Sequence, residues 1–166
     1  MSVTPDAMPD RAEVQFNCTG TAVGKMRNEL AVEMVRPFHE SFELASDEGS
    51  FHGGDASAPP PLALFVGGLT GCIMTQIRAF AKRLGVTIED LKVETRVVWD
   101  WAKAGKVYET RPKSFEIDVL LESPDETPAV VALIEAAKKG CFIEQSLGQS
   151  NTIRHRLKRG EDYIDF

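Results

Sequence analysis

Three cysteines, Cys18, Cys72 and Cys141, are the residues of this 166-residue chain with the most distinctive chemistry. A thiolate is a nucleophile, and a thiol oxidised to sulfenic acid condenses with a second thiol to a reversible disulfide. An odd number of cysteines cannot all pair with one another, so a structural disulfide framework is not expected. Each cysteine is therefore judged by its neighbours.

Cys72 lies in a run of apolar and small residues that contains Gly67, Gly68 and Gly71. The run predicts a helix, in which each glycine costs about 1 kcal/mol relative to alanine. Close approach of another backbone is the usual compensation. Gly67, Gly71 and Thr75 are spaced four apart, so they form a smooth stripe suited to packing against another helix. Cys72 is either a reactive thiol beside this contact or one more small core residue.

Cys141 directly follows Gly140, where a predicted helix stops, and it opens a possible further turn. Free N–H groups at a helix start lower the pKa of a thiol, although a buried junction residue is the alternative interpretation. Cys72 and Cys141 together indicate a thiolate and a partner for disulfide formation. Cys18 shares the apolar face of a predicted strand, where a free cysteine behaves as a small hydrophobe, so we expect a structural role.

Other chemistry has little support in the sequence. There is no C-x-x-C motif, and His39, His52 and His155 have no ligand spacing to the cysteines, so no metal site is expected. No phosphate-binding or dinucleotide-binding glycine motif is present, and Gly53 and Gly54 are interpreted as a bend. We therefore expect no cofactor. A Cys–His hydrolase stays an alternative, because its partners need not be close in sequence.

Composition predicts a soluble globular protein, with 43% apolar residues, 27% charged residues and a net charge of −6. The acidic balance argues against nucleic acid or an anionic membrane as partner. Residues 1–11 are polar and are expected to be a frayed end, and residues 12–166 a single domain. The N-terminus lacks the basic and apolar regions of a secretory signal, so a cytoplasmic location with reduced thiols is expected.

Alternating apolar residues predict a strand over Glu13–Val23, and the pattern resumes from Leu30 to Met34. The turn between them places Lys25 and Arg27 near a hairpin tip. A third strand is predicted within Phe38–Leu44, followed by a glycine- and proline-rich loop over Asp47–Pro61.

A helix is predicted from Pro60 or Pro61 to Leu84, stopped by Gly85. Its first half, Leu62–Met74, is apolar on every side and too short a run to span a bilayer. A helix that is apolar all round is a buried helix, so we expect it at the centre of the fold or between two subunits.

Two strands with clear alternation, Leu91–Trp101 and Phe115–Leu121, are predicted to form an antiparallel pair around a loop that holds Gly105 and Pro112. A second helix follows, with Thr127 as its predicted cap and Gly140 as its stop. Phe142–Leu147 is expected to add one or two turns, and the tail from Asn151 is mostly polar. Antiparallel strands with segregated helices predict an α+β fold.

Two segments carry a resemblance to a known family: Pro61–Cys72, in which a proline opens an apolar helix that leads to a cysteine, and Ala136–Cys141. They resemble the family of osmotically induced protein C (OsmC) and organic hydroperoxide resistance protein (Ohr). Gly53-Gly54-Asp55 and the helix exit Leu84-Gly85-Val86 also fit, and the similarity runs from about Phe16 to Leu147.

The resemblance implies an OsmC-like fold, with antiparallel strands wrapped around a central pair of buried helices in an intertwined homodimer. It also implies cofactor-free reduction of organic hydroperoxides. Cys72 would become a sulfenic acid, Cys141 would condense with it, and an external dithiol would reduce the disulfide. A small hydrophobic peroxide is the implied substrate. The arginine that assists Cys72 matches Arg27 best and Arg36 second.

Two positions depart from the family pattern. Leu62 stands where the hydroperoxide reductases have a glutamate that orients the arginine, and Phe142 stands where a proline usually follows the second cysteine. We therefore expect the arginine to be held less firmly than in the typical enzymes. The alternatives are a non-catalytic OsmC-like dimer that binds a small hydrophobic ligand, and a thiol redox sensor.

Overall fold

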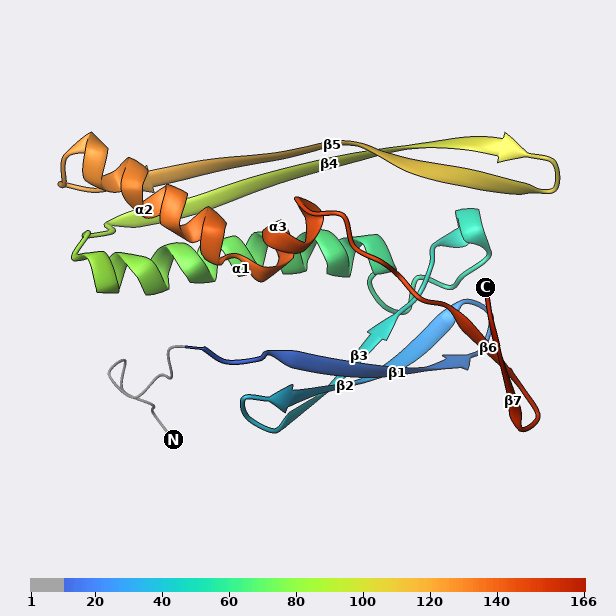
Figure 1. Ribbon diagram of the computed structural model, residues 1–166. Helices are drawn as coiled ribbons and strands as arrows, with labels where there is room; N and C mark the ends of the chain where they lie inside the picture. The colour runs from blue at the N-terminus through green and yellow to red at the C-terminus, as the bar shows by residue number, and fades with distance from the viewer. Residues whose placement is uncertain (1–10) are drawn as a thin grey trace. The chain divides into compact units, whose positions relative to one another are not determined.

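The computed structural model describes residues 11–166 (Figure 1), so the predicted frayed end lies, apart from Arg11, outside the described residues. The chain divides into two compact units, one ending at Phe65 and the other starting at Val66, and each is described by itself. Antiparallel sheets and helices make up an α+β fold, as the sequence predicted.

The first unit is a three-stranded antiparallel sheet in the order β1–β2–β3. Its strands are β1 (Gln15–Val23), β2 (Arg27–Arg36) and β3 (Glu40–Ser46). Gly24 has a φ of 70° in the β1–β2 turn, a conformation that favours glycine. The predicted hairpin is confirmed, with Arg27 paired to Val23 beside the turn and Arg36 paired to Gln15 at the far end.

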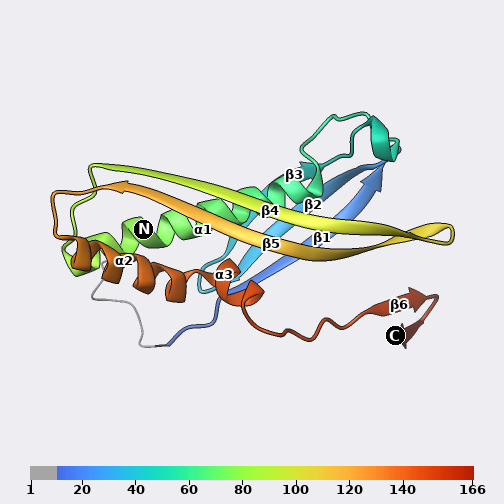
Figure 2. The same cartoon turned by 90° about the horizontal axis from the view of Figure 1, so that it is seen from above.

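The second unit contains most of the long helix, two hairpins and two shorter helices (Figure 2). The elements are α1 (Pro61–Leu84), β4 (Asp90–Ala104), β5 (Val107–Glu122), α2 (Thr127–Gly140), α3 (Phe142–Leu147), β6 (Arg156–Arg159) and β7 (Asp162–Asp165). The predicted helix bounds and the antiparallel β4–β5 pair are confirmed.

The core of the second unit forms where α1 and α2 pack on the β4–β5 hairpin (Figures 1 and 2). The buried cluster consists of Ile73, Ile77, Ala81, Leu133, Ala137 and Cys141. Apolar residues of β4 and β5, including Val93 and Ile117, pack against this cluster. The alternation of the two strands thus supplies one apolar face, which the helices cover.

Within the chain, α1 is buried along one stripe rather than on every side. Its buried residues, Leu69, Ile73, Ile77 and Ala81, are spaced four apart, whereas Leu62 is 55% exposed. The prediction that α1 is buried on every side is therefore not met within one chain. By length and composition α1 could also cross a membrane, a test that the core helix of a soluble protein passes as well.

Two local predictions are wrong, and one hairpin was not predicted. Pro112 lies within β5 rather than in a loop, next to a register irregularity. Proline has no N–H to donate to a sheet. It is tolerated here because both strands of a two-stranded sheet are edge strands. Glu126 rather than Thr127 occupies the cap position of α2, and its side chain makes no capping hydrogen bond. The polar tail forms a hairpin, β6–β7, whose turn contains Gly160 with a φ of 64°.

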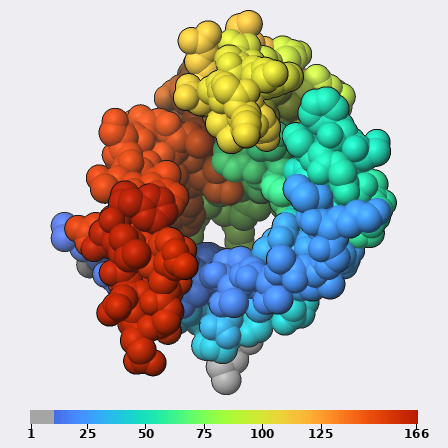
Figure 3. Space-filling view, turned by 90° about the vertical axis from the view of Figure 1, so that its right-hand side faces the viewer, coloured from blue at the N-terminus to red at the C-terminus, as the bar shows by residue number. Residues whose placement is uncertain are grey.

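The tip of the β4–β5 hairpin, yellow in the end-on view of Figure 3, carries exposed apolar residues. Trp101 is 63% exposed and Val107 is 67% exposed, and the Trp101 ring contacts Tyr108 edge to face. The two strands continue here beyond their contact with the helices.

Candidate active site

The structure brings Cys72 and Cys141 together in the core of the second unit. Cys72, on α1, is half-buried and packs against the buried cluster that contains Cys141. Cys141 is fully buried at the junction of α2 and α3. Both are free thiols. The two cysteines for which the resemblance implies a pairing are therefore neighbours in the core.

A close approach of α2 to α1 positions Cys141. A Cβ atom at Gly140 would lie 2.6 Å from Cζ of Phe80 on α1, so only glycine leaves the Phe80 ring in its place. The next residue along the chain is Cys141. Gly140 thus serves both to end α2 and to allow the contact that sets the second thiol against α1.

Burial dominates the electrostatics of Cys141. The pKa of its thiol is raised from 9.0 to about 11, chiefly by desolvation; the Glu144 backbone N–H lowers it, and the neighbouring Cys72 thiol and the Glu144 carboxylate add to the rise. The Cys141 side chain makes no capping hydrogen bond to α3. The expectation that the helix start lowers this pKa is wrong, because desolvation outweighs the amide. Cys141 is protonated at neutral pH.

The two candidate arginines lie in the first unit, at opposite ends of β2. Their Cα atoms are separated by about 30 Å along an extended strand. Arg36 pairs with Glu13 through exposed side chains. A single thiol therefore cannot be served by both arginines of one chain.

Arg27 is held by a network within its own unit. Its Nε lies 2.7 Å from Glu29 Oε1, and its Nη1 donates to the Ser57 carbonyl and hydroxyl oxygens at 3.0 and 2.9 Å. The Ser57 hydroxyl donates in turn to Asp47, which is 2% exposed, at 2.7 Å. Hydrogen bonds from Ser57, chiefly from its backbone N–H, lower the pKa of Asp47. Arg27 thus has a carboxylate, a carbonyl and a hydroxyl as partners, and the comparison of its support with that in the typical enzymes stays a prediction.

The loop that carries Ser57 is closely packed. A Cβ atom at Gly54 would lie 1.9 Å from the carbonyl oxygen of Glu48, so this position requires glycine. Lys25, at the hairpin tip, pairs with Asp55 of the same loop at 2.8 Å. The bend predicted at Gly53 and Gly54 is thus part of the support for Arg27.

Cys18 lies on β1 opposite Val32 and is exposed within the chain. It is therefore not a core residue of its own unit. It also lies in a different unit from the other two cysteines.

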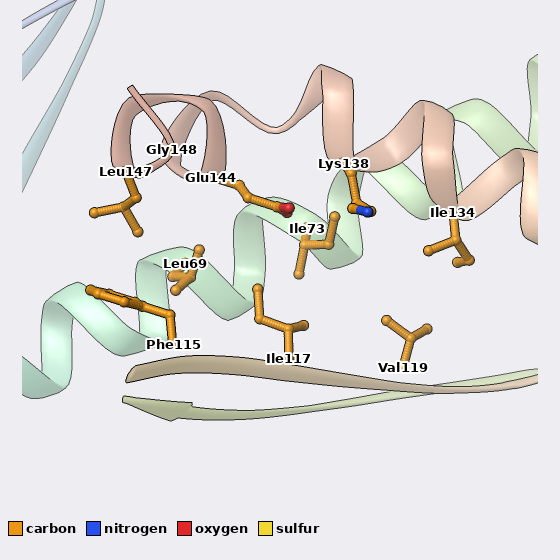
Figure 4. Close-up of a pocket in the computed structure, with 10 residues that line it drawn as sticks. All are labelled: Leu69, Ile73, Phe115, Ile117, Val119, Ile134, Lys138, Glu144, Leu147 and Gly148. Carbon is orange, nitrogen blue, oxygen red and sulfur yellow. The ribbon is translucent and has the colours of Figure 1, made fainter. Parts of the chain in front are cut away.

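A pocket of about 450 Å³ lies within the second unit, between α1, β5 and the α2–α3 segment (Figure 4). Its walls are mostly apolar: Leu69, Ile73, Phe115, Ile117, Val119, Ile134 and Leu147. Leu69 and Ile73 belong to the same helix as Cys72, with Ile73 next to it in sequence. Such a pocket suits a small apolar molecule.

Two charged residues, Lys138 and Glu144, also line the pocket. Sequence analysis did not select either of them. The sequence did place the Glu144 carboxylate within one helical turn of Cys141. The segment Phe142–Leu147 is too short, however, for hydrophobic periodicity to indicate that Glu144 is partly buried. Among residues 11–166, no group of three histidine, cysteine or acidic side chains is placed to bind a metal ion.

Comparison with known proteins agrees with this arrangement. Residues 53–156 match the family profile described as OsmC-like protein. The chain belongs to the OsmC-like family. It is 72% identical to the crystal structure of an OsmC-like hydroperoxide resistance protein from Jannaschia sp. CCS1, with 94% of this chain and all of that chain covered and a TM-score of 0.65.

More distant OsmC-like structures share the fold. An OsmC-like protein from Mycoplasma pneumoniae has 16% identity and a TM-score of 0.61, over 84% of this chain and 89% of that chain. A protein from Psychrobacter arcticus, described as a putative osmotic stress induced and detoxification response protein, has 18% identity and a TM-score of 0.56, over 78% and 85%. No curated protein gives a significant match.

The raised pKa of Cys141 predicts a loss of stability at alkaline pH. The folded OsmC-like chain keeps the Cys141 proton to about pH 11, whereas the unfolded chain releases it near pH 9.0, so unfolding releases a proton in between. Stability should fall across this range by on the order of 2 kcal/mol more in the wild type than in Cys141→Ala. Urea unfolding at pH 8 to 11 measures the difference. Cys18→Ala, which leaves Cys141 buried, should follow the wild type; equal slopes for wild type and Cys141→Ala would contradict the assignment.

Proposed function

We propose that this protein reduces organic hydroperoxides with its own thiols and without a cofactor. The observation that carries the proposal is the half-buried Cys72 packed beside the fully buried Cys141. The 72% identity to a protein described as a hydroperoxide resistance protein supports it. The apolar pocket on the same helix supports an organic substrate. The cytoplasm, where dithiol reductants are available, is the compartment that fits.

The reaction has three balanced steps. The Cys72 thiolate attacks the distal oxygen of ROOH, the O–O bond breaks, and the products are Cys72 sulfenic acid and an alkoxide, which takes a proton to become ROH. The Cys141 thiol then displaces the sulfenic oxygen as water and forms the Cys72–Cys141 disulfide. An external dithiol reduces this disulfide by two exchanges and is itself oxidised.

The environments of the two thiols favour this order. With its pKa raised to about 11, Cys141 is a poor first nucleophile at neutral pH. It suits the second step, in which it attacks a sulfur already placed against it. Cys72, which is more accessible, is the better candidate to meet the peroxide.

Arg27 is the cation that we assign to Cys72. A guanidinium keeps its charge and can hydrogen-bond sulfur and a peroxide oxygen together. Glu29, Ser57 and Asp47 fix Arg27 in advance, so little side-chain entropy is lost when it engages the thiolate. Arg36, paired with an exposed glutamate near the N-terminus, is the second candidate.

The active form is proposed to be a homodimer. Only 17% of the most apolar window of α1 is buried within one chain. A Cβ atom at Gly67 or Gly71 would meet nothing within 4 Å, so these two glycines of the small-residue stripe have no close packing partner among residues 11–166. A second copy would cover this face and also the exposed Trp101 and Val107.

The runner-up is an OsmC-like dimer that binds a small hydrophobic ligand without turnover. The pocket volume of about 450 Å³ falls in the usual range for small-molecule sites, and Leu62 removes the family's glutamate. The cysteine variants below separate this function from the peroxidase.

Cys72→Ser is expected to abolish reduction of cumene hydroperoxide in the presence of an excess of dithiol. Cys141→Ser should still form one equivalent of sulfenic acid, detectable by a dimedone adduct on Cys72, but should lose most turnover. Cys18→Ser, the matched control, should keep wild-type rates because Cys18 lies outside the thiol pair. Absence of Cys72 oxidation by any organic hydroperoxide would reject the peroxidase and leave the binding protein.

Arg27→Met is expected to slow Cys72 oxidation at pH 7 by on the order of 10²-fold, because the thiolate loses its cation. Loss of free thiol in stopped-flow experiments at pH 7 measures this rate. Arg36→Met is the matched control and should behave as the wild type. If Arg36→Met reproduces the defect and Arg27→Met does not, the two assignments are reversed.

Gly71→Leu tests the dimer. If this face of α1 met solvent, replacing glycine by leucine would stabilise the helix, because leucine has the higher helix propensity. Against a second copy, the bulkier side chain should separate the subunits and lower the melting temperature at dilute concentration. Analytical ultracentrifugation measures the association. Lys82→Leu, which places the same side chain on the exposed last turn of α1, is the control. A folded, stable wild-type monomer would refute the proposal.

A further inference from the structure

The pocket of the second unit has one polar end. Figure 4 shows the side chains of Glu144 and Lys138 directed into a space otherwise lined by apolar groups. Lys138 Nζ lies 3.1 Å from Glu135 Oε1, so the ammonium already has an acidic partner on α2. Lys138 also attracts the Glu144 carboxylate, but among residues 11–166 its ion pair is with Glu135.

Glu144 has an unused acceptor at this end. Within residues 11–166, Glu144 Oε2 is the buried side-chain oxygen that has no hydrogen-bond partner. Buried polar atoms are almost always hydrogen-bonded, so an exception that faces a pocket requires a partner, which a water molecule or a bound ligand can supply. A molecule that fills the apolar space and presents one O–H or N–H donor would satisfy this oxygen.

We propose that Glu144 Oε2 accepts the terminal O–H of the hydroperoxide and thereby determines which peroxides the pocket selects. The inference rests on the proposed function for the identity of the occupant. The preferred substrates are neutral, compact hydroperoxides with an aryl or branched alkyl body, which contacts Leu69, Ile73 and Ile117. Peroxides that bring a carboxylate to this end are disfavoured by charge repulsion.

The surroundings of Glu144 agree with this role. Burial raises the pKa of its carboxyl group, the nearby Glu135 raises it further, and Lys138 lowers it. Glu144 is also three residues after Cys141, and its carboxylate acts on the pKa of that thiol. A substrate held by Glu144 is thus held on the segment that carries the second cysteine.

The test compares two unreactive analogues that differ in one donor. 2-Phenyl-2-propanol has the body and the O–H of reduced cumene hydroperoxide, and its methyl ether lacks the O–H. Isoleucine δ1-methyl NMR spectra of the full-length reduced protein report the site directly, because Ile73, Ile117 and Ile134 line the pocket. Ile153 and Ile164, in the C-terminal tail and β7, serve as internal controls.

In the wild type, the alcohol should bind more tightly than the ether by a factor of about ten to one hundred, as for a hydrogen bond to a charged acceptor. Glu144→Ala should bring the ratio close to one, and Glu144→Gln, which keeps a carbonyl acceptor, should retain part of it. Glu126→Gln, an exposed carboxylate outside the pocket, is the matched control. An unchanged ratio in both Glu144 variants, or shifts confined to Ile153 and Ile164, would overturn the inference.

Kinetics separate this inference from the proposed function. Glu144→Ala should raise the KM for cumene hydroperoxide several-fold, with oxidation of Cys72 as the measured reaction. If Cys72 is oxidised at the wild-type KM in Glu144→Ala, the role of Glu144 is wrong although the protein is a peroxidase. If Cys72 is never oxidised while the alcohol still binds through Glu144, the peroxidase is wrong and the donor-selective site stands.

Discussion

The packing of α1 against α2 over the β4–β5 hairpin is the contact on which the chemistry depends. It removes Ile73, Ile77, Leu133 and Ala137 from water, and Cys141 is buried in the same cluster. The contact is close because Gly140 leaves room for the Phe80 ring. Apolar burial therefore both builds the unit and sets the protonation state of one thiol, since the desolvation that stabilises the core also disfavours the thiolate.

Much of this could be predicted from the sequence. Period-two alternation predicted β1, β2, β4 and β5, and proline and glycine signals predicted the ends of α1. Those patterns are local. The pKa of Cys141 depends on contacts that are not local. Amides at the start of a helix favour a lowered pKa, but burial is the dominant cause of the raised pKa, and no local pattern indicates it. Glu144 was missed for the same reason, because its position in a pocket depends on residues of α1 and β5.

The short elements were the hardest to predict. β6 and β7 have four residues each and expose all of them, so no alternation between a buried and an exposed face marks them. Pro112 was interpreted as a loop residue because proline breaks most sheets, yet β4 and β5 form a two-stranded sheet with a register irregularity at that point. In each case an edge or an exposed face relaxes the rule on which the prediction depended.

Leu62 bears on how Arg27 is held, because the resemblance implies a glutamate at this position that orients the arginine. Taken alone, the loss of a glutamate at the start of α1 implies an unsupported arginine. In the structure, Arg27 instead has a carboxylate two residues along its own strand, Glu29, and a hydroxyl from Ser57 that is backed by the buried Asp47. All of these partners lie within one unit, so the geometry of the guanidinium is fixed without any group from α1. The absence of the glutamate at Leu62 therefore does not by itself leave the Arg27 guanidinium without hydrogen-bond partners.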